Sequence, residues 1–484
     1  MVADDKNALA AALDLPPSYD HAVTPGPSEG SSSAPSAPRA PPKESLVFFQ
    51  APEHAEPLFG QRTTPEDILA DIKFTMKGKH LVTCDARLQN PNVLYDWIRY
   101  RALQQPNMVL HCSGRHYEVP ERDETVTDRD GVRSRRKGQP EQIVDFDFTV
   151  DLGSVYKHPD NTANIHIDTV RSDRPTARGT HELTYAASYS QVGHRDLYAP
   201  LLGPVDAGAV ADSSYISICK EWVPWRLFRG LPPWKRMEDT VEFWEQRGKG
   251  KHTARIALRD DGFDPEADTR LDGDDTRATL KQWCEKYTSD PSWLKSFVVP
   301  IWLWGWNLEA LQTAIEGAIK STGYNSNDVK VQFELEQIVI EVHPPNLLSR
   351  AVNTTWVYVL LWMTLLYPLV WIWQRMHTLG GGPYQVSSIN YGLKFYPPLP
   401  STFPSETIEA AQDRLGGMYK LHSELPKPAQ LAYGPLGVHY LLGRKEGEWF
   451  REWEERIRMG VRMRYRGALE GGGEEEAGAG LDGY

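Results

Sequence analysis

The sequence predicts an α+β soluble region with a mixed, partly antiparallel sheet, one transmembrane helix and a disordered N-terminal tail. Three observations lead to this fold class. The order strand, helix, strand, strand occurs twice, around residues 80–119 and 297–342. Residues 351–374 carry no charge, which is typical of a membrane span. In the tail of residues 1–44, the segment from Pro16 to Pro42 offers no large apolar side chain except Tyr19 to bury.

The overall composition limits the class of protein. The chain has 484 residues, with 53 Lys or Arg and 65 Asp or Glu, so the formal net charge is −12. Nucleic-acid-binding proteins are usually basic, so we expect no nucleic-acid partner. The four cysteines lie far apart in sequence and indicate reduced thiols, not a disulfide framework or a zinc site. The acidic first residues also argue against a secretory signal.

The tail, residues 1–44, contains one candidate binding motif. Between Pro16 and Pro42 there are eight Pro and six Ser in 27 positions, so we expect disorder. Within it, Pro16, Pro17 and Tyr19 match the pattern Pro-Pro-x-Tyr. Two prolines favour a polyproline II turn, which WW domains hold between aromatic rings while a second pocket takes the Tyr. The alternative is a chance match in a Pro-rich segment.

The α+β region comprises a first half, residues 45–211, and a second half, residues 212–345, which meet at a Gly/Pro/Ala-rich stretch. In the first half we expect a helix capped by Thr64, a strand at His80–Cys84, a helix at Asn92–Leu103, and strands at Met108–Cys112, Tyr117–Val119 and Ile143–Leu152. In the second half we expect a strand at Ile216–Val223, helices at Thr276–Tyr287 and Asn307–Lys320, and strands at Val329–Leu335 and Ile338–Val342.

A short Trp-rich run, Phe297–Leu308, is apolar on both faces. Its 12 residues are too few to span a bilayer as a helix. Trp302, Trp304 and Trp306 alternate with aliphatic residues, which is strand periodicity. We expect a buried strand, and the alternative is an element at a membrane surface.

Residues 351–374 are predicted to form the transmembrane helix. Within them, 16 of the 20 residues of Thr354–Trp373 are apolar or aromatic. A helix of this length rises about 30 Å, the thickness of the hydrocarbon core. Pro368 is expected to kink it near its end. The residues expected to contact lipid, two aromatic pairs at the ends and a leucine near the centre, are Trp356, Tyr358, Trp371, Trp373 and Leu365. A core helix of a soluble protein is the alternative.

The C-terminal region, residues 375–484, should contain a basic amphipathic helix and an acidic tail. The segment Trp449–Arg466 carries six Arg against three Glu, with apolar residues three to four apart and an interruption at Gly460. This helix is expected either to lie on an anionic lipid surface or to pack on its own domain. Arg375 and Lys394 slightly favour a cytosolic C-terminus, but the missing signal peptide favours a cytosolic N-terminal domain, which we adopt.

Catalytic motifs do not emerge from the sequence. His111-Cys112 begins like a Cys-dependent phosphatase loop, but Glu118 stands where the phosphate-binding Arg would be. The acidic loop Asp268–Thr279 lacks two of the ligands of a calcium loop. We therefore name no catalytic, cofactor-binding or metal-binding residue, and expect no cofactor.

Together, Pro16, Pro17, Tyr19 and the span resemble the membrane adaptors of HECT-type ubiquitin ligases, although the Trp-rich α+β region departs from them. The wider layout resembles uncharacterised fungal single-span membrane proteins, which implies no activity. The resemblance implies a lipid bilayer and a WW-domain protein, such as a HECT-type ligase, as partners. We therefore expect a single-pass membrane adaptor or scaffold. The alternatives are a membrane-anchored enzyme with its site in the α+β region and a lipid-contacting protein.

Overall fold

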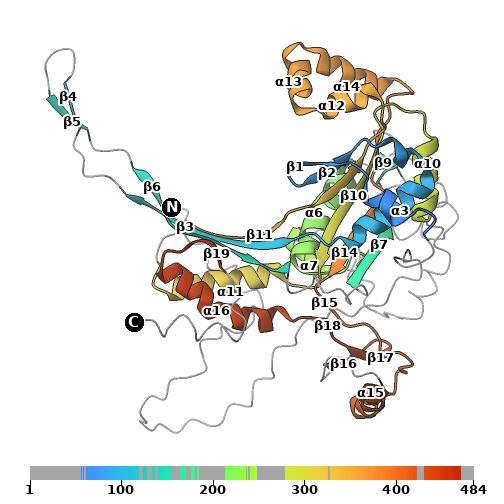
Figure 1. The fold of residues 1–484 in the computed structure, drawn as a ribbon. Helices are drawn as coiled ribbons and strands as arrows, with labels where there is room; N and C mark the ends of the chain where they lie inside the picture. Colours follow the sequence, from blue (N-terminus) through green and yellow to red (C-terminus); the bar gives the residue numbers. More distant parts are fainter. Residues whose placement is uncertain are drawn as a thin grey trace, which may run out of the picture.

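The computed structural model describes residues 56, 58, 62–118, 124–127, 133–136, 140–153, 164–170, 176–179, 183–184, 213–235, 237, 240–247, 278–324, 328–421 and 430–469. The fold of these residues is α+β with mixed sheets, as predicted (Figure 1). The tail with Pro16, Pro17 and Tyr19 lies outside the described residues, as does the acidic C-terminal end.

The larger sheet has seven strands in the order β1-β2-β12-β10-β14-β7, with β13 also paired to β10. Their bounds are β1 Thr75–Lys77, β2 His80–Thr83, β7 Ile165–Thr169, β10 Ser296–Trp304, β12 Val339–Val342, β13 Pro383–Tyr384 and β14 Ser387–Gly392. Strand β12 runs parallel to β2 and antiparallel to β10, while β13 and β14 run parallel to β10. The Trp-rich run is therefore the buried strand that was predicted, at the centre of a mixed sheet.

The second sheet has four strands in the order β11-β3-β6-β19, with bounds β3 Met108–Glu118, β6 Glu141–Asp151, β11 Asp328–Leu335 and β19 Arg466–Leu469. Figure 1 shows β3 and β6 running on together into an arm, near whose end β4 (Glu124–Thr127) pairs with β5 (Arg133–Arg136). The two strands predicted at Met108–Cys112 and Tyr117–Val119 are one strand with a register shift after Gly114.

Helices cover these sheets: α2 Glu66–Ala70, the 3-10 helix η2 Ala86–Gln89, α3 Pro91–Leu103, α6 Ser213–Phe228, α7 Val241–Arg247, α10 Leu280–Ser289, α11 Leu308–Ser321 and α16 Glu446–Arg462. A smaller C-terminal unit contains β15 Lys394–Phe395, α15 Ile408–Leu421, β16 Leu431–Gly434, β17 Gly437–Tyr440 and β18 Leu442–Gly443. In the first half of the chain, β8 Thr176–Ala177 pairs with β9 Leu183–Thr184. Helix α3 packs on α10, and α11 packs on α16. Side chains at the N-caps fix where the helices start: Asn307 accepts from the Ala310 amide, as predicted, and Thr279 forms a capping box with Gln282.

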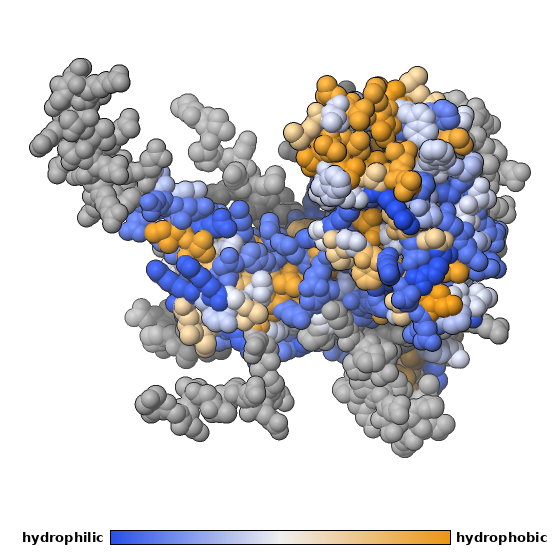
Figure 2. Space-filling model, turned by 45° about the horizontal axis from the view of Figure 1, so that its top comes forward, coloured by the Kyte–Doolittle hydropathy of each residue, from blue (hydrophilic) through white to orange (hydrophobic). Residues whose placement is uncertain are grey.

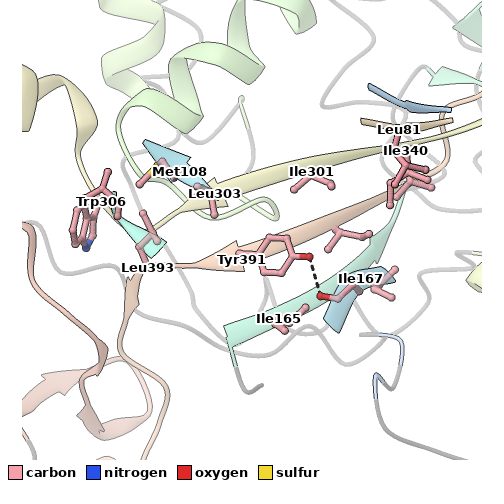
Figure 3. Packing of buried hydrophobic residues seen from close by; sticks show 14 of the residues in the cluster. Leu81, Met108, Ile165, Ile167, Ile301, Leu303, Trp306, Ile340, Tyr391 and Leu393 are labelled. Carbon is pink, nitrogen blue, oxygen red and sulfur yellow. Dashed lines mark hydrogen bonds between the residues drawn. The ribbon is translucent and has the colours of Figure 1, made fainter. Parts of the chain in front are cut away.

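The main hydrophobic cluster of the described residues includes side chains from both sheets, from Leu58 to Val461. Figure 3 shows Leu81, Ile301, Ile340 and Tyr391 from four strands of the larger sheet within it. The Tyr391 hydroxyl donates to the carbonyl oxygen of Ala102 at 2.8 Å, so even the polar end of this side chain is satisfied inside the core. Residues beyond the uncharged stretch thus complete a core that begins some 300 positions earlier.

Three local expectations are corrected by the structure. Ile216–Val223 lies in helix α6, not in a strand, because short apolar runs do not distinguish the two and here Trp222 packs on Phe243 of α7. Pro65, not Thr64, is the N-cap of α2, and no side chain caps this helix; the Thr64 amide donates to the buried Asp96 carboxylate. Helix α16 continues through Gly460, which packs against Phe148 of β6.

Helix α16 packs on its own domain, which was one of the two alternatives for the basic amphipathic segment. Its buried residues are Trp449, Phe450, Trp453, Ile457, Gly460 and Val461. Two of its arginines pair with glutamates of the same helix, Arg458 with Glu454 at 2.6 Å and Arg462 with Glu455 at 3.5 Å. The apolar face of this helix is therefore occupied by the core and is not free to enter a lipid surface.

Candidate membrane-binding site

The uncharged stretch 351–374 does not form the single helix that was predicted. It lies within three helices, α12 Leu347–Asn353, α13 Thr355–Met363 and α14 Leu366–Met376, which we call the apolar lobe (residues 347–376). Figure 1 shows the lobe standing out from the body beyond the larger sheet. Among the described residues, no single helix is long and apolar enough to cross a membrane. The pair Thr355–Met363 and Leu366–Gln374 has the length and composition together, but is bent by 104°.

Pro368 explains the position of this bend. A proline in a continuous helix cannot donate to the carbonyl four residues earlier and its ring clashes with that carbonyl, which here belongs to Thr364. The chain breaks at this point, and Leu365 adopts the left-handed conformation with φ 59° and ψ 14°. Pro368 then falls in the first turn of α14, where a missing N–H is tolerated. The kink expected near the end of one helix is instead a sharp turn between two.

The lobe exposes most of its apolar surface. Leu365 is 71% exposed and Trp356 69%, and Figure 2 shows a continuous hydrophobic patch here. Exposed apolar side chains of the lobe are Leu347, Trp356, Tyr358, Val359, Leu360, Trp362, Met363, Leu365, Leu366, Leu369, Trp371, Ile372 and Met376. The Thr354 and Thr364 hydroxyls each donate to a carbonyl one turn earlier, at 2.8 Å, so both are already satisfied within the helices. Contiguous patches of this kind usually mark an interaction site.

The five residues predicted to contact lipid all lie on the lobe, but not as two belts at the ends of a straight helix. Trp356, Leu365 and Trp371 are exposed. Tyr358 packs edge-on against Tyr367 across the bend, with ring centroids 4.9 Å apart, and so holds the two helices together. Trp373 lies at the base of the lobe, where its ring stacks on His377.

One residue at this site carried no sequence signal. Trp293 precedes β10 and is about half exposed, and its ring lies 6.0 Å from that of Trp373. Its backbone carbonyl accepts from the Asn346 side chain, and its amide donates to the Leu379 carbonyl. The loop before β10 thus contacts the chain on both sides of the lobe. These contacts join residues far apart in sequence, so no local pattern could indicate them.

The strands that flank the lobe decide its topology. Val342 at the end of β12 and Tyr384 in β13 both pair with Phe297 of β10, one on each side. Neighbouring strands lie about 4.8 Å apart, so the chain leaves the body and returns to it within roughly 10 Å. The parts before and after the lobe therefore lie on the same side of any membrane that the lobe enters. The expected single crossing would put residues 375–484 on the opposite side of the bilayer from β12, whereas β13 and β14 lie in the same sheet as β12.

Polar clusters elsewhere in the described residues bear on the alternative of an enzyme. His111 contacts Asp147 at 2.5 Å, and Asp145 accepts from His116 and Tyr324 at 2.7 Å each. Burial alone would raise the pKa of Asp145, but the two hydrogen bonds outweigh it and the pKa is lowered. No group of three or more His, Cys, Asp or Glu in the described ranges could hold a metal ion.

Cys112, which the sequence placed in a failed phosphatase motif, is buried in β3. Burial raises the pKa of its thiol, so the reactive thiolate is disfavoured. These clusters point to no particular reaction, whereas the lobe has a definite physical requirement, a cover for its apolar surface.

Comparisons with protein-family models, with curated proteins and with solved structures find no match to this chain.

Proposed function

We propose that the protein is a membrane-attached adaptor or scaffold whose apolar lobe enters one leaflet of a bilayer and leaves on the same side. The observation that carries this is the pairing of Val342 and Tyr384 with the two sides of Phe297, beneath an exposed apolar lobe. Helices α13 and α14 have 9 and 11 residues. They rise about 14 and 17 Å, against about 30 Å for the whole hydrocarbon core, so their length fits one leaflet.

A bilayer accounts for the lobe better than a protein partner does. Residues 351–374 contain no charge at all, so this stretch offers a partner protein few polar contacts. The Thr354 and Thr364 hydroxyls are satisfied by carbonyls of their own helices, as lipid requires. Trp373 and Trp293 gather at its base, and tryptophan favours the level of the lipid headgroups. A second copy of the chain covering the lobe is the competing occupant.

Vesicle flotation with protease protection tests the attachment and its topology together. Purified protein should float with phosphatidylcholine vesicles, and tags at both ends should be digested from outside. Leu365→Arg places a charge at the most apolar turn and should lower vesicle affinity at least tenfold, or about 1.4 kcal/mol, with the fold retained. Protection of one tag only would restore the single crossing. A dimer that does not float would show that a second copy covers the lobe.

The adaptor function rests on Pro16, Pro17 and Tyr19. A membrane-attached body in the cytosol would hold this tail near the bilayer surface, within reach of a WW-domain protein such as a HECT-type ubiquitin ligase. A peptide of residues 11–22 should bind WW domains in titration. Tyr19→Ala should weaken binding about 30-fold, if the ring contributes about 2 kcal/mol as interface anchors often do. Equal binding by both peptides would leave the motif as a chance match and would remove the adaptor function.

A further inference from the structure

One face of the larger sheet gathers polar side chains next to the lobe. The strand register sets Lys77 of β1, His80 of β2 and Val339 of β12 side by side. Glu341 of β12 lies two residues further along, and side chains two apart share a face. The opposite face of these strands is the core, where Leu81 and Ile340 are fully buried. The polar face is thus the outer one, and His80 remains 43% exposed on it.

This outer face is joined to the base of the lobe. The Lys77 ammonium donates to the carbonyl of Asn353, the last residue of α12. Arg350, one turn earlier on α12, is exposed. Burial raises the pKa of the Cys84 thiol, just beyond β2, while the charges of Arg350 and Lys77 oppose that rise. Both cations therefore lie close to Cys84, where α12 meets the sheet.

The charges at this place do not cancel. Glu341 is held by His80 at 2.7 Å and His343 at 3.3 Å, and hydrogen bonds from His343 and His80 lower its pKa to about 2. Within the described part of the chain, neither Lys77 nor Arg350 forms an ion pair with a carboxylate. Glu341 is thus engaged by the two imidazoles, and it does not neutralise the charges of Lys77 and Arg350.

We infer that this surface, formed by Lys77 and Arg350 with His80 and His343 on the adjoining face, binds the phosphate of an anionic phospholipid headgroup. The inference rests on the proposed function, because only a lobe inserted in lipid brings its base to the headgroup level. Lysine and arginine are the side chains that favour phosphate oxygens, and their charges attract an anionic leaflet. In Figure 2, hydrophilic residues border the hydrophobic patch of the lobe.

Vesicle binding with and without an anionic lipid tests this inference. Affinity should be higher for mixed phosphatidylcholine and phosphatidylserine vesicles than for phosphatidylcholine alone. Lys77→Gln and Arg350→Gln should each lower affinity for the mixed vesicles about fivefold, and the double variant about 25-fold. Affinity for phosphatidylcholine alone should not change, since the lobe is intact. Lys77→Arg should bind as the parent does, because it keeps the charge.

Lys330→Gln is the matched control, because Lys330 is an exposed lysine on β11, in the other sheet. Its variant should keep the full preference for the anionic vesicles, and an equal loss there would overturn the site. Inorganic phosphate should compete no more than chloride at equal ionic strength; stronger competition would indicate a site for free phosphate. A parent that binds both vesicles equally would overturn this inference alone. A parent that binds neither would instead overturn the proposed function.

Discussion

Two apolar, Trp-rich stretches of this chain are similar in composition but differ in burial. Phe297–Leu308 forms β10 and its exit, and Trp304 and Trp306 are each 1% exposed. Thr354–Trp373 forms most of the lobe, where Trp356 is 69% exposed and the helices pack chiefly on one another. β10 is hydrogen-bonded to neighbouring strands on both sides, whereas the lobe is joined to the body by isolated hydrogen bonds, such as that from Lys77 to the Asn353 carbonyl. Hydrophobic composition predicts that a segment avoids water. It does not predict whether the protein core or another surface will cover the segment.

The largest effect that separates the two stretches should come from a matched pair of truncations. Trp306→Ala should lower the free energy of unfolding by about 3–5 kcal/mol, because it opens a cavity and removes the indole N–H that donates to the Arg444 carbonyl at 2.6 Å. Trp356→Ala should change it by less than about 0.5 kcal/mol and should weaken vesicle binding. Denaturant unfolding in mild detergent measures both. Similar losses of stability would mean that the lobe is part of the core.

Each stretch contains one residue with positive φ. The residue that follows β10, Gly305, should be the less tolerant of substitution. A Cβ at Gly305, where φ is +101°, would lie 2.3 Å from the carbonyl oxygen of Lys394. Gly305→Ala should therefore cost about 2–4 kcal/mol, from backbone strain and overpacking together. The same unfolding measurement applies. A neutral result would show that the backbone around Lys394 can move away, and that β10 is less tightly enclosed than its burial indicates.

Acid should weaken the strand that leads from the core into the lobe. The depressed pKa of Glu341, about 2, means that the ionised carboxylate stabilises the fold. This contribution is complete above the ordinary pKa of Glu, near pH 5, and is lost as the pH falls toward 2. Glu341→Gln should flatten the decline of stability over that range by about 1–2 kcal/mol. Asp85, whose pKa is also lowered to about 2, chiefly by Arg87, stays in both proteins and provides the common background.

The smallest effect is expected at the bend of the lobe. Leu365 has φ 59°, which costs a non-glycine residue about 1–2 kcal/mol, whereas glycine adopts it freely. Leu365→Gly should thus leave stability unchanged or raise it by up to about 1 kcal/mol, because glycine also loses more entropy on folding. Leu365→Val should lower it, since a branched side chain tolerates positive φ poorly. A loss of stability in the glycine variant would indicate that the bend is not part of the stable fold.

Local sequence patterns predicted the helices and strands that depend mainly on their own residues. The helix after Asn307 and the strand β10 follow from periodicity and capping, which act over a few residues. The alternation in β6 failed at one position. Strict alternation would put Asp145 on the face opposite Val144 and Phe146, but Asp145 is the extra residue where the register of β3 and β6 shifts, and it is buried between His116 and Tyr324. Such a bulge depends on the partner strand, which the local sequence does not contain.

The sequence by itself determined that residues 351–374 avoid water and that Pro368 interrupts them, because hydrophobicity and the missing N–H are properties of the residues themselves. Only the tertiary structure decided that the chain enters and leaves this stretch at neighbouring points of the same sheet. That outcome depends on Val342 and Tyr384 pairing with the two edges of Phe297, contacts between segments some 45 to 90 positions apart. Which strands pair depends on segments that are distant in sequence and on the packing of the whole core. Local periodicity therefore does not predict the pairing.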